Sequence, residues 1–287
     1  MRVVSLVPGA TETIVALGAA DLLVGVSQSC DDPAVTHLPR VTRTRVPPDA
    51  SSIEIDRIVR ECLASGESLY AIDAPLLRRL EPDLIVTQGL CDVCAVTSRE
   101  VHRALCTMAT IPRVVSTEPH RLVEVWDSIA EIGATLGRET AARELVGTLC
   151  ARVAAIEALA VRAAPRPRVA FLEWLDPPMC GGHWNPELVH LAGGLDGIGR
   201  PGEPSRTIGW QEVAAWKPDV LCVACCGYGA DRTVAELNPA LHLPQLADVP
   251  FMRSGRIHAF DGVRQFTRPG PGLADSLEAL AEAVSHA

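Results

Sequence analysis

The sequence predicts an α/β protein with two similar lobes, each built on a mostly parallel sheet, and a long helix that bridges them. Three observations lead to this prediction. Apolar strand-like runs alternate with helical spacing along most of the chain, which is typical of parallel sheets. Residues 80–86 read as a helix end, Pro-Asp and an apolar strand, and residues 216–222 repeat this order. Between the copies, residues 121–163 contain no proline and keep helical spacing that is broken only near Gly133 and Gly137, which predicts one helix followed by a long one.

The first lobe is expected to start with a strand, a Pro-Gly turn and a helix. A second strand ends in a polar loop, and a third follows Pro82-Asp83 and runs into a loop with two cysteines. The expected elements are, in order, a strand over 2–7, a helix over 11–17, a strand over 22–26, helices over 51–63 and 74–80, a strand over 84–87, a helix over 98–108 and a strand over 113–116.

The same order restarts after Pro165-Arg166-Pro167, with a strand over 169–172 and a helix over 186–191. We therefore divide the chain into an N-terminal α/β lobe over 1–118, a helical bridge over 119–164 and a C-terminal α/β lobe over 165–287. Because ligand sites of parallel sheets lie at the carboxyl ends of the strands, the site is predicted in a cleft where the loops of the two lobes face each other.

Composition excludes several classes of protein. The 287 residues are 48% hydrophobic and 21% charged, which is typical of a globular chain rather than a disordered or fibrous one. The net charge of −9 argues against nucleic-acid binding. No apolar run reaches the about 18 residues of a membrane span, and the start of the chain lacks the pattern of a signal peptide. The chain as written is expected to be cytoplasmic, or periplasmic or extracellular if a signal peptide has been removed.

Several segments together resemble one known family. They are residues 2–12, 22–26 and 82–85 in the first lobe, and residues 171–178, 182–184, 192–194 and 268–271 in the second. In order and spacing they look like the cobalamin-binding branch of the class III solute-binding proteins of ABC importers, and the likeness covers nearly the whole chain. The resemblance implies a rigid bridging helix, little hinge motion and a corrinoid, cobalamin or a relative, as the ligand in the cleft.

The resemblance also implies docking to an ABC permease through one acidic residue in each lobe. Glu212, in Trp210-Gln211-Glu212, fits the acid of the second lobe. In the first lobe Asp73 is the candidate, with Glu54 as the alternative.

A corrin ring is wide, partly flat and fringed with amides, so its site needs aromatic faces and neutral hydrogen-bonding groups. Trp184, Tyr228 and Phe266 lie in predicted cleft loops and are the first candidates, and a cleft loop would expose Trp184. Further candidates for ligand contact are Trp174, His183, Gln88 and Arg268. His183 or a cysteine thiolate is also a candidate for direct cobalt ligation.

The ten cysteines are interpreted as reduced thiols or metal ligands rather than as a disulfide framework. Cys30, Cys91, Cys94 and Cys226 each follow a predicted strand, so closure of two lobes could gather four thiolates around zinc or an iron–sulfur cluster. Four others, Cys62, Cys106, Cys150 and Cys222, lie in helical or strand patterns and are expected to be small buried hydrophobes.

Three functions remain open. The first is corrinoid binding, as a solute-binding protein or a cytoplasmic derivative of one. The second is a cytoplasmic metalloprotein that uses the loop cysteines. The third is binding of an iron–siderophore or heme, where an anionic ligand would favour Arg43, Arg45 and Arg268. No nucleophile, phosphate-loop or metalloprotease motif occurs, so the chain is expected not to be an enzyme.

Overall fold

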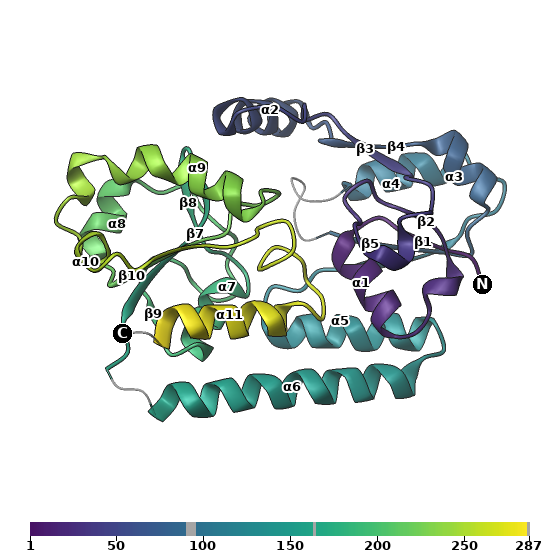
Figure 1. Ribbon diagram of the computed structural model, residues 1–287. Helices are drawn as coiled ribbons and strands as arrows, with labels where there is room; N and C mark the ends of the chain where they lie inside the picture. Colours follow the sequence, from purple (N-terminus) through teal and green to yellow (C-terminus); the bar gives the residue numbers. More distant parts are fainter. Residues whose placement is uncertain (90–95, 163–164, 286–287) are drawn as a thin grey trace. The chain divides into compact units, whose positions relative to one another are not determined.

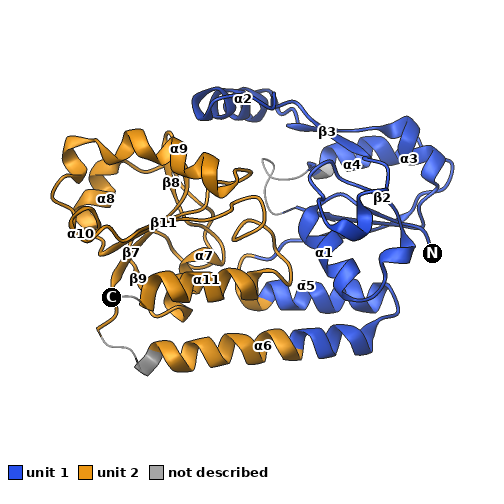
Figure 2. Cartoon of the chain, viewed as in Figure 1, with its two compact units in different colours: residues 1–119, 124–146 blue, residues 120–123, 147–287 orange. Residues whose placement is uncertain are grey.

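The computed structural model describes residues 1–89, 96–162 and 165–285 (Figure 1). The chain forms two compact units (Figure 2). Unit 1 comprises residues 1–119 and 124–146, and unit 2 comprises residues 120–123 and 147–287. The chain therefore crosses into unit 2 for the four residues around the start of α5, and it enters unit 2 for good within the long helix α6.

Unit 1 contains a parallel sheet of four strands in the order β2-β1-β5-β6. Its strands are β1 (Val3–Ser5), β2 (Leu23–Val26), β5 (Leu84–Gln88) and β6 (Arg113–Thr117). All three residues of β1 and all five of β5 are buried, as expected for a parallel sheet that is covered on both faces.

Side chains of consecutive strand residues point to opposite faces of this sheet, and they enter two separate cores. Val3 and Val86 pack with Ile14 of α1 and Ile132 of α5 on one face. On the other face, the alternate residues of the same strands pack against α3 and α4. The helices of unit 1 are α1 (Pro8–Ala16), α2 (Ser52–Ser65), α3 (Ala74–Leu80), α4 (Ser98–Leu105), most of α5 (Leu122–Thr135) and the start of α6 (Glu139–Arg162), with short 3-10 turns η1 (Ala20–Leu22) and η2 (Pro33–Val35).

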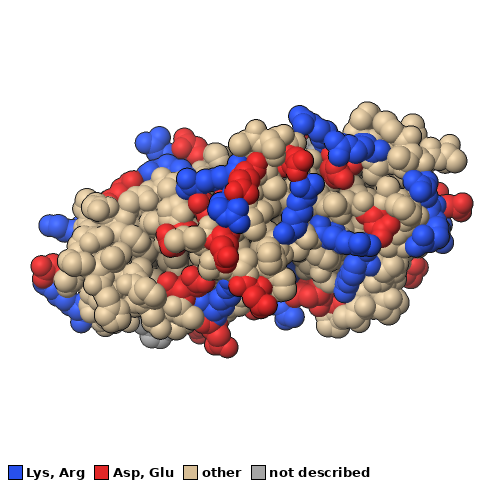
Figure 3. Space-filling model, turned by 90° about the horizontal axis from the view of Figure 1, so that it is seen from above, with Lys and Arg blue, Asp and Glu red and all other residues tan. Residues whose placement is uncertain are grey.

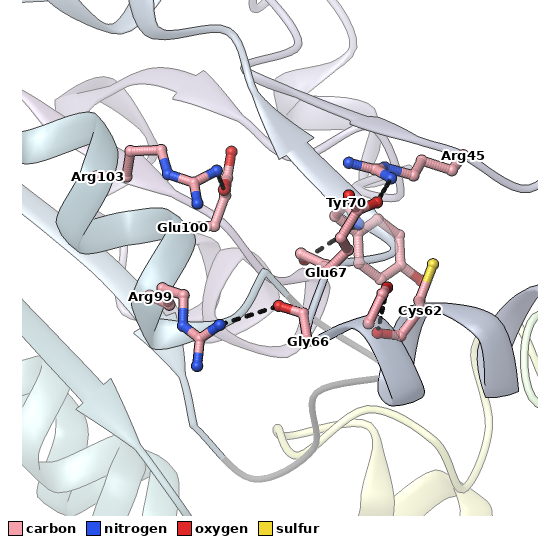
Figure 4. Close-up of polar contacts among 10 residues, drawn as sticks. Arg45, Cys62, Gly66, Glu67, Tyr70, Arg99, Glu100 and Arg103 are labelled. Atoms are coloured by element: carbon pink, nitrogen blue, oxygen red, sulfur yellow. Dashed lines mark hydrogen bonds and ion pairs between the residues drawn. The ribbon is translucent and has the colours of Figure 1, made fainter.

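A separate antiparallel pair, β3 (Thr42–Thr44) and β4 (Tyr70–Ile72), carries helix α2. Ser51 and Glu54 form a capping box at the start of α2. Gly66 ends the helix at a φ of 67°, a left-handed conformation that glycine adopts without strain. Arg99 of α4 donates to the Gly66 carbonyl at 3.1 Å, and Arg45 pairs with Glu67 (Figure 4). These contacts attach the end of α2 to the rest of unit 1.

Unit 2 contains a second sheet, in the order β11-β10-β7-β8, with β9 paired to β7. Strand β8 is antiparallel to β7, and the other pairs are parallel. The strands are β7 (Arg168–Leu175), β8 (Pro178–Cys180), β9 (Leu195–Asp196), β10 (Val220–Val223) and β11 (Ile257–Ala259). The helices are α7 (Asn185–Leu191), α8 (Trp210–Trp216), α9 (Ala230–Leu241), α10 (Pro250–Ser254) and α11 (Leu273–Ser285), with the 3-10 turn η3 (Pro244–Leu246).

The sequence repeat corresponds to the same local structure in both units. Helix α3 ends at Glu81 and helix α8 ends at Lys217, at φ angles of 43° and 53°. The aspartate that follows in each copy accepts a backbone N–H at the start of the neighbouring strand. Asp83 accepts from Arg2 at 2.7 Å, and Asp219 accepts from Arg168 at 2.8 Å. The Pro-Asp signal thus marks where a helix ends and two parallel strands are aligned.

The predicted α/β class and the parallel sheets are confirmed. The predicted helix and the long helix after it are confirmed as α5 and α6, and Gly137 lies between them at a φ of 66°. The strand expected over residues 2–7 is shorter, because Pro8 already begins α1. The pair β3–β4 and the strand β8 were not expected, since three-residue strands show too little alternation to detect. The separate helical bridge over 119–164 remains a prediction.

Among the helices that the structure describes, none has both the length and the apolar composition needed to cross a bilayer.

Candidate ligand-binding site

Aromatic and cationic side chains gather at the carboxyl edge of the unit 2 sheet. Strands β7 and β10 are parallel neighbours, with Leu172 opposite Val223, so the residues that follow them meet at one edge. Trp174 lies near the end of β7 and Tyr228 lies after β10, and their ring centroids are 4.9 Å apart at an interplanar angle of 46°. We call Trp174, Tyr228 and Arg232 the unit 2 platform.

A tight turn returns Tyr228 to Trp174. The Tyr228 N–H donates to the Cys225 carbonyl at 3.0 Å, and Gly227 has a φ of 79°. A positive φ at the third residue is what a type II turn requires, and glycine provides it at no steric cost. The Cys226 N–H donates to the Glu173 carbonyl at 3.1 Å, which attaches this turn to β7.

Arg232 completes the platform from the first turn of α9. Its guanidinium carbon is 3.7 Å from the centroid of the Tyr228 ring, and Nη2 donates to the Tyr228 hydroxyl at 3.0 Å. A cation in the first turn of a helix opposes the helix dipole, and at this position the aromatic ring and the Glu236 carboxylate, 3.9 Å from Nε, both interact favourably with Arg232. Trp174 is half-buried, whereas Tyr228 is 3% exposed beneath its neighbours.

Trp184 and Phe266 form the support behind this edge. The Trp184 indole N–H donates to the Phe266 carbonyl at 2.8 Å, and Trp184 is 3% exposed, so the expectation that a cleft loop exposes it is wrong. Phe266 is fully buried, with its ring 5.0 Å from that of Phe171 and 4.9 Å from that of Phe260. Both side chains therefore have their partners inside unit 2.

A carboxylate organises the loop that carries His183. Glu173 Oε1 accepts from the Gly182 N–H at 3.0 Å and from the Asn185 side-chain amide. A Cβ on Gly182 would lie 2.2 Å from the Ser205 backbone nitrogen, so only glycine fits there. His183 follows with a φ of 52°. Burial, and then the nearby His120, lower the pKa of His183.

The predicted polar residues Gln88 and Arg268 lie in different units. Gln88 is buried at the end of β5 in unit 1. In the loop after β2, the Gln28 backbone N–H donates to the Thr42 hydroxyl oxygen at 3.0 Å. Arg268 is 7% exposed and lies in unit 2 just before α11. The unit 1 edge therefore offers neutral amide and hydroxyl groups.

The cysteines proposed as metal ligands lie in different surroundings. Cys30 is buried, and its sulfur is 3.1 Å from the Thr11 hydroxyl. Cys226 is exposed in the turn before Tyr228. Cys91 and Cys94 lie outside the described residues, so the four-thiolate site remains a prediction. Within the described ranges, no three His, Cys, Asp or Glu side chains are grouped to hold a metal.

The other cysteines divide by exposure. Cys62 and Cys222 are buried as expected, and burial raises the pKa of the Cys222 thiol to about 12. Cys106 and Cys150 are exposed, and the expectation of burial was wrong for both. Cys106 directly follows α4, and Cys150 lies on the solvent side of α6.

Both proposed docking acids hold an arginine of their own unit. Glu212 accepts from both terminal nitrogens of Arg206, and this hydrogen bonding lowers the pKa of the Glu212 carboxyl. Asp73 caps α3 by accepting from the Leu76 N–H at 2.9 Å, and it pairs with Arg43 at 3.0 Å. On the face drawn in Figure 3, basic and acidic side chains lie next to one another.

Comparison with known proteins shows the fold to which these units belong. No protein-family model and no curated protein matches the chain. Solved structures do. A periplasmic heme-binding protein from Roseiflexus sp. RS-1 is 24% identical with a TM-score of 0.73, and the match covers 99% of this chain and 98% of that one. The periplasmic vitamin B12-binding protein of Vibrio cholerae is 18% identical with a TM-score of 0.71, over 99% and 96%. A periplasmic heme-binding protein from Pseudomonas aeruginosa is 21% identical with a TM-score of 0.75, over 100% and 93%.

The chain has the class III periplasmic solute-binding fold. In this fold, sequence reasoning overlooked two residues beside the predicted site. Arg232 lies in the first turn of α9, four residues after Tyr228, so its nearness in the sequence to a predicted aromatic residue was the available signal. His120 carries no such signal, because its partner His183 is distant in the sequence and only the fold brings their rings within 5.5 Å.

Proposed function

We propose that the chain is a solute-binding protein whose ligand is a corrinoid, cobalamin or a relative. Three independent points support this proposal. The sequence resembles the cobalamin-binding branch of class III proteins, the fold is shared with a vitamin B12-binding protein, and the unit 2 platform offers an aromatic surface at a sheet edge where ligands of parallel sheets bind.

The platform is the observation that carries the proposal. A macrocycle is bound well by a flat aromatic face with few fixed polar groups beside it. Trp174 provides that face, because it is half-buried while the ring of Tyr228 supports it from 4.9 Å. Arg232 holds Tyr228 through its ring and its hydroxyl, so the pair of rings is ordered before a ligand arrives and less entropy is lost on binding.

Trp184 and Phe266 have a supporting role in this proposal. Their side chains are buried, and the hydrogen bond between them joins the loop before α7 to the loop before α11. Gln88 is proposed as a hydrogen-bonding partner for a ligand amide, since its side chain ends the buried strand β5.

Heme is the second candidate ligand. Two of the three similar structures named above are heme-binding proteins, and the aromatic platform would suit a porphyrin as well as a corrin. The two ligands differ at their rims, because porphyrin carboxylates would favour contact with a guanidinium such as that of Arg232, whereas corrin amides are neutral.

The fold also leads us to propose an ABC permease as the partner, with Glu212 and Asp73 as docking acids. Each acid already holds an arginine, Arg206 and Arg43 respectively. Docking would then exchange these partners for basic residues of the permease. Reversal of the charge in Glu212→Lys should weaken transport without changing the affinity for the ligand.

The deciding experiment is a parallel titration of the full chain with cyanocobalamin, hemin and a ferric hydroxamate siderophore, followed by calorimetry and absorbance. The proposal expects saturable one-to-one binding of cyanocobalamin that is at least tenfold tighter than binding of the other two. Tighter hemin binding would make heme the ligand. Absence of saturable binding of any of the three would refute solute binding of this class.

A further inference from the structure

Two imidazoles form a pair in unit 2 that the proposed function does not use. His183 lies in the loop after β8, and His120 lies two residues before the start of α5. Their ring centroids are 5.5 Å apart and their planes are inclined by 54°. The centroid of the His183 ring is also 5.7 Å from the centroid of the Trp184 ring. Residues 63 positions apart are thus brought together at the point where the chain crosses into unit 2.

The position of His183 is fixed by its backbone rather than by its ring. Its φ of 52° is uncommon for a residue other than glycine. Two hydrogen bonds keep it there, from the His183 N–H to the Glu203 carbonyl at 2.6 Å and from the Gly202 N–H to the His183 carbonyl at 2.8 Å. Such strain persists only where the surroundings over-determine it, and it concentrates at ligand sites.

The imidazole of His183 also has an unused nitrogen. Its Nδ1 is buried and has no hydrogen-bond partner among the described residues. A buried polar atom without a partner costs free energy in the unliganded protein, and binding an ion would remove that cost. Histidine imidazole is a common metal ligand.

The spacing of the rings matches two ligands of one metal. With a metal–nitrogen bond of about 2.0–2.1 Å and tetrahedral geometry, and about 1.2 Å from nitrogen to ring centre, two ligating imidazoles have centroids about 5.3 Å apart. The observed separation is 5.5 Å. This separation allows one nitrogen of each ring to reach a shared ion.

The charge near the pair does not oppose a cation. Arg121 follows His120 in the chain, and its guanidinium is 3.4 Å from the Glu187 carboxylate. Glu187 also accepts from the Leu122 N–H at 3.2 Å. One carboxylate therefore balances the arginine and holds the segment that carries His120 against α7.

We propose that His120 and His183 bind one divalent transition-metal ion of the copper, nickel or zinc type, with water completing its coordination. The ion would join the segment before α5 to the loop before α7, both within unit 2. This site needs no corrinoid and none of the four loop cysteines. Borderline-soft metals are favoured because imidazole suits them better than it suits calcium or magnesium.

The test uses the full chain with its accessible thiols alkylated, so that cysteines neither bind nor reduce the metal, and one equivalent of copper(II). Electron paramagnetic resonance counts the coordinating nitrogens, and calorimetry gives the affinity. The variants are His120→Ala, His183→Asn and the double variant, where asparagine is chosen because it tolerates a positive φ. The matched control is His242→Ala, an exposed histidine of unit 2 whose ring nitrogen contacts the Asn238 carbonyl at 2.8 Å.

We expect two imidazole nitrogens on copper in the unaltered chain and in the His242→Ala control. Each single variant should lose one of them and bind at least tenfold more weakly. Nickel(II) should raise the Tm of the unaltered chain but not of the double variant, since a ligand of the folded state stabilises it. The inference is overturned if the double variant keeps the same affinity and nitrogen count, or if the unaltered chain shows fewer than two nitrogens. Circular dichroism on each variant confirms that it is folded, and His120→Ala alone still decides the outcome if His183→Asn does not fold.

Discussion

Removal of the Trp174 ring is the sharpest test of the unit 2 platform. An aromatic side chain buries about 150–250 Å² when fully covered. At most about a third of the Trp174 surface is exposed beside Tyr228, so a ligand would cover at most about 80 Å² more. At about 25 cal/mol per Å², that area contributes at most about 2 kcal/mol to binding. Trp174→Ala should therefore weaken cyanocobalamin binding by about ten- to thirtyfold.

The assay is isothermal titration calorimetry on folded variants, with Trp174→Phe as the matched substitution. Phenylalanine keeps a flat ring but loses the hydrogen bond from the indole to the Asp176 carbonyl, which is 3.1 Å long. We expect Trp174→Phe to stay within about fivefold of the unaltered chain, because most of the covered aromatic area remains. Trp126→Phe, in the core of unit 1, controls for loss of a tryptophan elsewhere. Equal affinities for the alanine variant and the unaltered chain would refute the platform as a ligand surface.

Three further predictions concern stability and reactivity. Burial raises the pKa of Asp196, so the folded state holds the proton more tightly than the unfolded chain does, and stability falls as the pH rises above the unfolded pKa of about 3.9. In urea unfolding at a series of pH values, the free energy of unfolding of Asp196→Asn should therefore rise relative to that of the unaltered chain as the pH rises. A difference that stays constant with pH would contradict this. Peptide mapping after brief alkylation of the native chain should find Cys226 modified and both Cys222 and Cys225 unmodified. Cys222 and Cys225 are buried, and burial raises the pKa of each thiol to about 12. Early labelling of Cys222 would contradict this and show that the core opens. Trp184→Phe should lower the free energy of unfolding by about 1–3 kcal/mol, since it leaves a buried carbonyl without its donor, and unchanged stability in chemical denaturation would exclude the supporting role.

The regular elements were predictable because local chemistry determines them. Helix α3 was predicted with its observed bounds, since Pro75 sits at its first turn and Glu81 ends it. Short elements were missed for the opposite reason. Strands β3 and β4 pair with each other only because the chain returns after α2, and that return is a tertiary event without a local signal.

The candidate site was predictable by region and less so by side chain. Trp184 and Phe266 were assigned to ligand contact because both lie in glycine-rich and polar loops. The structure buries both, because a loop that follows a sheet edge can fold back onto the core. Exposure of an aromatic ring depends on this return path, so the choice between Trp174 and Trp184 could not be made from residue type.

The internal repeat separates the residues that build the fold from those that carry chemistry. Asp83 and Asp219 make the same backbone hydrogen bond in the two units, so their shared role is alignment of strands and not ligand recognition. The units differ directly after the corresponding strands. Strand β5 ends in Gln88, whereas β10 leads through a tight turn to Tyr228 and the platform. Because the scaffolds before these points are equivalent, the difference in chemistry at the two edges cannot be a requirement of the fold.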